Sequence, residues 1–213
     1  MPHVALITTA HPLPAVAVAG LPSGALVLRH RARPDGPAWT GLVAVPIGPD
    51  AGAEGVLDLV DALGVRPERA ALGRVQPGLD LWAPGAARGP AVHVTEYITS
   101  DPTHREGYYG SQGAVSGPAM RDLWQGGLVQ RFVGVEVLHD VVPGPGDDTP
   151  WDLLHVTSFS LAALPRMLGW RRLFDQHAQA AGYPDMRSLS ARWAGQRTMH
   201  QVRSRLLRGP GRA

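Results

Sequence analysis

A strict alternation of side chains marks residues 128–139 as a β-strand. One face of this segment carries Val129, Val133, Val135 and Val137. A side-chain period of two belongs to an extended chain and does not fit a helix, whose period is about 3.6. The segment therefore predicts a sheet with an apolar face that other parts of the protein must cover.

Alternation also extends to the neighbouring segments. Residues 92–98 place Glu96 among aliphatic side chains on one face of a strand, and residues 152–160 place His155 on one face of another. Residues 198–207 fit either a fourth strand or the extension of a basic helix.

Helices are expected between these strands. Thr103 and Glu106 have the spacing of a capping box, which predicts a helix start. Three glycines within residues 107–113 weaken that helix, so we expect a loose or broken element that restarts at Pro118. A second, amphipathic helix is expected over residues 160–181, which gives the order β-α-β-β-α.

The first half of the chain has weaker signals. Its alternating or periodic segments predict strands at residues 3–9, 25–31, 39–47 and 78–82 and a helix at residues 53–63. The run APGAARGP within residues 83–90 has the composition of a linker. We therefore expect an N-terminal αβ region (1–90) and a second domain (91–213), and the first region is either a degenerate copy of the second unit or unrelated to it.

Composition excludes several classes of protein. The sequence contains no Cys, so disulfides and cysteine metal sites are excluded. All 20 basic residues are arginine and the net charge is only +2, so no nucleic-acid partner is expected. No apolar run approaches the roughly 20 residues of a membrane span, and the N-terminal segment lacks the basic start of a signal peptide. A cytoplasmic protein without a membrane partner is expected.

Glu96 and His155 are the candidate catalytic residues. A carboxylate among aliphatic side chains is desolvated, which raises its pKa and suits Glu96 to general acid–base chemistry. The alternative for Glu96 is a structural ion pair with Arg131 or Arg105. His155 either shuttles protons or is a hydrogen-bonded histidine of the core.

The candidate substrate-binding residues combine aromatic and cationic side chains. Tyr108, Tyr109 and Trp124 are expected to line a pocket for a planar substrate, although Trp124 also fits ordinary core packing. Arg105 and Arg131 are expected either to clamp a carboxylate or phosphate or to form salt bridges. Nucleotide-binding and metal-protease motifs are absent from the sequence, so neither a cofactor nor a metal is expected.

The order of elements in the second half resembles the ferredoxin-like unit of the dimeric α/β-barrel superfamily, which includes antibiotic-biosynthesis monooxygenases, polyketide cyclases and REDY-like proteins. Arg-Glu-Gly-Tyr-Tyr at residues 105–109 looks like the REDY-type pattern, with Gly107 in place of its acidic residue, and Arg-Asp-Leu (121–123) and Gln-Arg-Phe (130–132) follow it. The resemblance implies a homodimer and a role in secondary metabolism. A fainter likeness to bacterial Pictet–Spengler cyclases is carried by Val-Thr-Glu at residues 94–96, where a strand carboxylate transfers protons.

Together these features predict an α+β fold: an antiparallel ferredoxin-like sheet with helices on one face, joined to the N-terminal region. The expected function is a cofactor-independent condensation or cyclisation of an aromatic small molecule by acid–base chemistry. Two alternatives stay open, a cofactor-free monooxygenase of natural-product biosynthesis and a protein that binds a metabolite without transforming it.

Overall fold

The computed structural model describes residues 3–22, 24–31, 39–82, 89–144, 151–162, 165 and 169–208. Eight antiparallel strands form a closed barrel in the order β1-β3-β2-β8-β5-β7-β6-β4. The strands are β1 (His3–Thr9), β2 (Leu26–His30), β3 (Gly41–Ile47), β4 (Arg69–Leu81), β5 (Ala91–Ser100), β6 (Val129–Val142), β7 (Leu153–Ser160) and β8 (Arg197–Arg208).

The expected open sheet with helices on one face is wrong. In the structure β2 pairs with β8 and β4 pairs with β6, so the sheet closes on itself and the strands of both halves of the chain share it. Because the sheet is closed, its inner face is covered by its own side chains rather than by a second sheet. The interior residues, drawn from every strand, include Leu6, Leu28, Ala44, Val75, Tyr97, Val135, Val156 and Val202.

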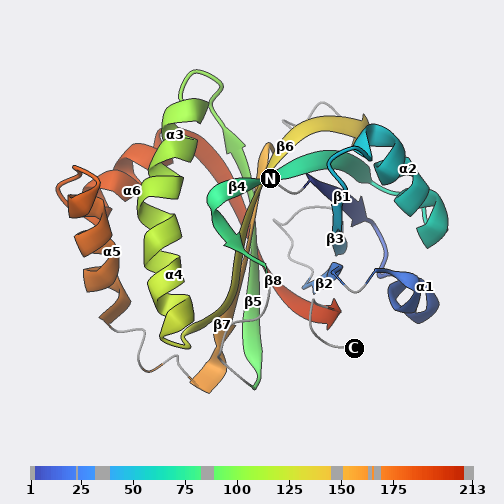
Figure 1. The fold of residues 1–213 in the computed structure, drawn as a ribbon, viewed down its shortest axis with the longest axis horizontal. Coiled ribbons are helices and arrows are strands. Elements are labelled where there is room, and N and C mark those ends of the chain that lie inside the picture. Colours follow the sequence, from blue (N-terminus) through green and yellow to red (C-terminus); the bar gives the residue numbers. More distant parts are fainter. Residues whose placement is uncertain are drawn as a thin grey trace.

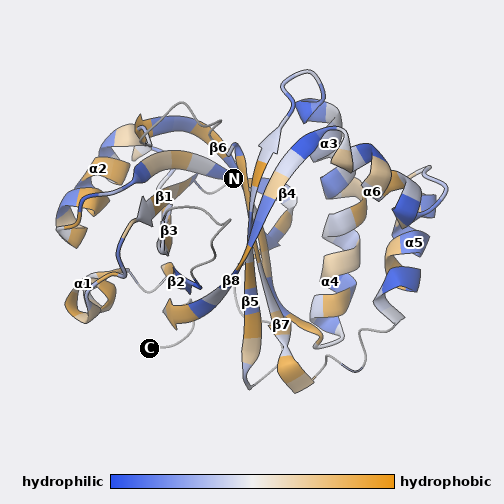
Figure 2. Ribbon diagram, turned by 180° about the vertical axis from the view of Figure 1, so that it is seen from behind, coloured by the Kyte–Doolittle hydropathy of each residue, from blue (hydrophilic) through white to orange (hydrophobic). Residues whose placement is uncertain are grey.

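Helices cover the outside of the barrel on two opposite sides (Figure 1). On the first side lie α1 (Ala15–Gly20) and α2 (Gly52–Leu63), which pack on the outer face of β1–β4. On the other side lie α3 (Arg105–Ser111), the π-helical segment η1 (Gln112–Ser116), α4 (Gly117–Gln125), α5 (Trp170–Ala180) and α6 (Met186–Ala194). In Figure 2, α5 carries several hydrophilic stretches on the outside, whereas β5 and β7 are banded, with hydrophobic and hydrophilic residues in turn.

The two halves of the chain repeat one order of strands. The first half places its strands as β4-β1-β3-β2 and the second half as β8-β5-β7-β6, so the last strand of each half pairs with the second strand of the other. The position of a domain boundary at residues 83–90 stays a prediction, because residues 83–88 lie outside the described residues.

Several local expectations are corrected. Thr103 does not cap a helix, because its hydroxyl donates to Asp101 and the cap residue, His104, makes no side-chain cap hydrogen bond. The element expected to break at the glycines runs without interruption from α3 through η1 into α4. Residues 197–208 form a strand, which decides between the two alternatives for this segment.

The helix expected over residues 160–181 is shorter, because Ser160 ends β7 and α5 begins only at Trp170. Within it, Leu164, Met167 and Leu168 lie outside the described residues. Among the helices that the structure describes, none is long and apolar enough to cross a membrane.

Candidate functional site

A row of polar side chains crosses the outer face of the second half of the barrel. Gln201 of β8 is the register partner of Glu96 on β5, Glu96 is the partner of His155 on β7, and His155 is the partner of Gly134 on β6. Register partners in a sheet point to the same face, so the three side chains lie side by side on the outer face, with His155 buried and Gln201 exposed. The structure thus brings the two candidate catalytic residues together.

Glu96 is held as a carboxylate by this row. The amide Nε2 of Gln201 donates to Oε1 at 2.9 Å, and Nδ1 of His155 lies 3.3 Å from Oε2. Burial alone raises the pKa of Glu96, but the contacts with His155 and Gln201 and the charge of Arg197 outweigh it, so the pKa is lowered. The expectation of a raised pKa is therefore wrong, and Glu96 pairs with neither Arg105 nor Arg131.

His155 is almost completely buried, with 3% of its side chain exposed. Its ring packs against Phe132, with 5.6 Å between ring centroids. Because an ionised Glu96 only accepts hydrogen bonds, the neutral form of the His155 ring carries its proton on Nδ1 and has its lone pair on Nε2. Nε2 is buried and has no hydrogen-bond partner among the described residues, so it is chemically available as a base.

The helical segment α3–η1 covers this row. Tyr108 of α3 is fully buried, its ring meets Trp193 of α6 edge-on at 5.9 Å, and Gln112 of η1 donates to its hydroxyl at 3.0 Å. Burial raises the pKa of Tyr108 to about 12, and Arg197 lies over the ring at 5.3 Å. A π-helical turn over a polar row is a common feature of functional sites.

A cleft of about 840 Å³ opens beside the row, between β4 and α3. Arg105 and Tyr109 line it as expected, and both are tied to Asp152: the Arg105 guanidinium lies 2.8 Å from its carboxylate, and the Tyr109 hydroxyl donates to its carbonyl at 3.2 Å. Burial raises the pKa of Tyr109, and the neighbouring Asp152 charge raises it further. Both tyrosine hydroxyls therefore stay protonated at neutral pH.

Gln76 connects the cleft to the catalytic row. It lines the cleft, it is only 5% exposed, and its Oε1 has no partner among the described residues. The same Oε1 lies 3.2 Å from the position that a Cβ on Gly134 would take. Since Gly134 is the register partner of His155, Gln76 reaches the strand position next to His155, although the side chain of Leu79 lies closer still to Gly134.

The two remaining candidates lie elsewhere. Trp124 packs beside the cluster of Leu79, Met120 and Leu123 and does not line the cleft. Arg131 faces the barrel interior, where its Nε donates to the carbonyl of Trp82 at 2.7 Å. Arg105 and Arg131 therefore lie on opposite sides of the sheet and cannot clamp one group together.

The sequence interpretation missed Gln76, Asp152 and Gln201. Gln76 stands next to Pro77 in a segment for which no strand was expected, and Gln201 lies on a strand that had only been offered as an alternative. Asp152 is the first residue of the strand expected over residues 152–160, and its sequence position indicates no role for it. Its carboxylate accepts from the backbone amide of Ser100 at 2.9 Å and from the Ser100 hydroxyl, which joins β5 to the segment before β7.

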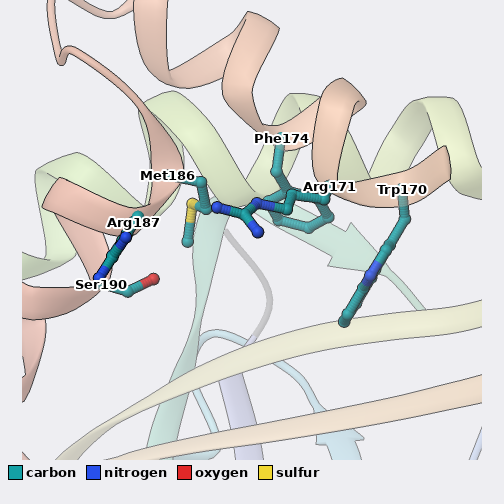
Figure 3. Close-up of a pocket in the computed structure, with 6 residues that line it drawn as sticks. All are labelled: Trp170, Arg171, Phe174, Met186, Arg187 and Ser190. Atoms are coloured by element: carbon teal, nitrogen blue, oxygen red, sulfur yellow. The ribbon is translucent and has the colours of Figure 1, made fainter. Parts of the chain in front are cut away.

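A second cavity, of about 530 Å³, lies between α5 and α6 and contains none of the candidate residues. Figure 3 shows Trp170, Arg171 and Phe174 on α5 facing Met186, Arg187 and Ser190 on α6. Within the described part of the chain, no group of three His, Asp or Glu side chains is placed to hold a metal ion.

Comparison with known proteins shows a shared fold but does not show an activity. No family model and no curated protein matches the chain. Among solved structures, it is similar to a candidate monooxygenase of Fusobacterium nucleatum subsp. nucleatum, with 9% identity, a TM-score of 0.51, and coverage of 97% of this chain and 92% of that one. A mutant chlorite dismutase of Candidatus Nitrospira defluvii matches with 10% identity, a TM-score of 0.47, and coverage of 96% and 91%. At 9% identity, the first match shows a shared fold and nothing about activity.

Proposed function

We propose that the protein is an enzyme in which His155, held by Glu96, transfers protons during a condensation or cyclisation of an aromatic small molecule. The observation that carries this proposal is the arrangement of the pair, with Nδ1 of His155 on the Glu96 carboxylate and Nε2 buried without a partner among the residues that the structure describes. A carboxylate that fixes one imidazole nitrogen leaves the other as a base and stabilises the imidazolium that forms.

In the proposed reaction, Nε2 of His155 takes a proton from an acidic C–H or N–H of the substrate. The resulting carbanion or enamine attacks an electrophilic carbon, such as a carbonyl carbon. In a Pictet–Spengler-type ring closure the order is reversed, because the aromatic carbon attacks the iminium carbon first and then gives its proton to Nε2. The imidazolium, paired with ionised Glu96, then returns its proton to the product, so no net proton is consumed. The cleft lined by Gln76, Tyr109 and Arg105 receives the aromatic part of the substrate, and a movement of α3–η1 opens the path to Nε2.

Deuterium exchange tests this assignment even when the product is unidentified. The protein is incubated in D2O with a panel of phenols and of arylethylamines with aldehydes, and mass spectrometry follows deuterium uptake and mass change. We expect His155→Gln to abolish exchange and Glu96→Gln to slow it by about 10²- to 10⁴-fold. Arg121→Gln, which removes an exposed ion pair with Asp80, is the matched control and should keep the wild-type rate. A wild-type rate in His155→Gln would refute the assignment, and binding without exchange would favour a metabolite-binding protein.

A cofactor-free monooxygenase is the second candidate, and the specific observation in its favour is the shared fold with the candidate monooxygenase of Fusobacterium nucleatum. Such a reaction also begins with proton abstraction by His155. The substrate carbanion supplies the electrons to dioxygen, so that a CH2 group and O2 become a C=O group and water. Oxygen consumption that depends on substrate would distinguish this reaction from condensation, which consumes none. We also propose that the protein acts in secondary metabolism, and either reaction is consistent with that role.

A further inference from the structure

A second polar row lies inside the barrel, on the face opposite to Glu96. Register partners connect Arg131 (β6), Ser158 (β7), His93 (β5), Ser204 (β8) and His30 (β2) across five adjacent strands. We call this row the polar belt. It lies at the end of the barrel where β4 ends and β5 begins.

Alternation along each strand shows that the belt faces inward. Val133 and Val135 of β6 belong to the interior cluster, so Arg131 two residues earlier points the same way. The same relation places Ser158 with Val156 and Ser204 with Val202. Tyr97 is also interior, and its hydroxyl lies 2.6 Å from Nε2 of His30.

The belt is rich in hydrogen-bonding groups. Ser204 Oγ lies 2.8 Å from Nδ1 of His30 and 3.1 Å from Oγ1 of Thr95, and Ser158 Oγ lies 2.8 Å from Nδ1 of His93. Burial lowers the pKa of His30 to about 4, so its imidazole is neutral at physiological pH. None of these groups supplies a negative charge.

Arg131 is the cation of the belt, and it has no counter-ion among the described residues. It is 3% exposed, and burial lowers its pKa only to about 10, so the guanidinium keeps its charge at neutral pH. Its one hydrogen bond to a described residue is from Nε to the carbonyl of Trp82. Arg69, which is also buried, differs in this respect, because Asp140 accepts from its Nε at 2.6 Å.

A buried cation without a counter-ion is strongly disfavoured unless an anion or ordered water satisfies it. The two Nη groups of Arg131 offer four N–H donors in the planar geometry that matches a carboxylate or a phosphate.

We propose that the polar belt binds a small-molecule oxyanion, a carboxylate or a phosphate group, which pairs with Arg131 inside the barrel. The hydroxyl of Ser158, the register partner of Arg131, completes the site as a neutral donor. The site is separate from the Glu96–His155 row, so it does not depend on the proposed reaction.

Titration with benzoate, inorganic phosphate and the neutral isostere benzamide tests the proposal on the wild-type chain. Binding by the folded state alone should raise Tm by roughly 5–10 °C when the anion is at about one hundred times its Kd. Benzamide should have no such effect. A larger effect of benzoate would identify a carboxylate as the ligand group, and a larger effect of phosphate would identify a phosphate. Equal effects of the anions and benzamide, or no effect of any probe, would overturn the proposal.

Variants assign the site. Arg131→Gln should weaken anion binding by roughly 10- to 100-fold, as expected for a lost charge-assisted pair. Arg105→Gln and Arg121→Gln, which remove cations on the outside of the barrel, should leave the affinity unchanged. If Arg131→Gln does not fold, Ser158→Ala provides a milder change, with a several-fold loss of affinity. A loss of binding in Arg105→Gln with full binding in the belt variants would place the anion in the outer cleft and refute the belt site.

Discussion

Glu96 keeps its charge inside the protein because its neighbours replace the water that burial removes. Gln201 and His155 contact its two oxygens, and Arg197 contributes a positive charge nearby. A carboxylate that accepts hydrogen bonds from fixed donors is stabilised in its ionised form. The same contacts orient His155, so at the residue scale the stability of the pair and its chemistry have one origin.

The lowered pKa of Glu96 predicts a pH-dependent contribution to stability. Its unfolded value is 4.5, so the stabilisation is fully present above that pH and is lost as the pH falls through the lower folded value. Glu96→Gln removes the charge, and we expect it to cost about 1–3 kcal/mol at neutral pH. Thermal unfolding of both proteins should show this difference at about pH 7 and a much smaller one at about pH 3. A difference that does not change with pH would contradict the prediction.

His30 predicts a second, separate pH window. Burial lowers its pKa from 6.5 to about 4, so the folded state holds it neutral and resists protonation. Above about pH 6.5, His30 is neutral in both the folded and the unfolded state, so it does not lower the free energy of unfolding. As the pH drops towards 4, only the unfolded state takes up the proton, and the free energy of unfolding falls by up to about 3 kcal/mol. Urea unfolding at several pH values should therefore show a shallower pH dependence in His30→Asn than in the wild type. His200→Asn, on the exposed end of β8, is the control and should not change the slope.

The sequence identifies Glu96 and His155 separately, but not their contact. Each stands out as a polar residue on an alternating strand, whereas the pairing depends on the register between β5 and β7. A shift of one residue would put the two side chains on opposite faces. The lowered pKa of Glu96 was unpredictable for the same reason, since its partners are 59 and 105 residues away in sequence.

At the scale of elements, a glycine lets the helical cover approach the sheet closely. Gly117 at the start of α4 lies against the turn of β4, where a Cβ would come 2.9 Å from the carbonyl oxygen of Gly78. Gly78 itself has a φ of +78°, which favours glycine. These two residues let α4 approach the irregular part of β4 between Val75 and Asp80, next to Gln76.

Gly117→Ala should therefore destabilise the protein even though alanine favours helices. We expect a loss of about 1–3 kcal/mol, because the clash is with backbone and cannot be relieved by a rotamer change. Gly107→Ala in α3 is the matched control: a Cβ there meets nothing within 4 Å, so the variant should gain up to about 1 kcal/mol from helix propensity. Chemical denaturation measures the change in the free energy of unfolding of each variant, which we expect to be a loss for Gly117→Ala and a gain for Gly107→Ala. Stabilisation by both substitutions would show that α4 does not need the close approach.

The strands were mostly visible in the sequence, and the exceptions have local causes. Proline and glycine at residues 77 and 78 concealed β4, whose first part pairs regularly with β1 before the irregularity. The glycines of α3 and η1 indicated a broken helix, but packing of Tyr108 and Val115 under the cover holds the helix together. Tertiary contacts thus override local propensity at both places.

At the scale of the whole molecule, the barrel is closed by two seams between the halves of the chain. At one seam β2 pairs with β8, and at the other β4 pairs with β6, with register shifts in both. Alternating patterns predict strands but not which strands meet, so closure was not predictable from them. A homodimer, which the resemblance implies, is not needed to cover the valine face of β6, because that face is already covered within one chain. Light scattering measures the mass of the protein in solution, and a mass of 22.7 kDa would mean a monomer.

Closure also predicts that the two halves unfold together. The interior cluster takes Leu28 from the first half and Val156 from the second, so neither half can keep its core without the other. We expect one calorimetric transition, with equal van't Hoff and calorimetric enthalpies. Leu28→Ala and Leu154→Ala, one in each half, should each cost about 2–5 kcal/mol and lower the same single transition. Val16→Ala, at a side chain 80% exposed, is the control and should leave the transition unchanged. Two separable transitions, each sensitive to only one of the core variants, would mean that residues 1–90 and 91–213 are independent folding units despite the shared barrel.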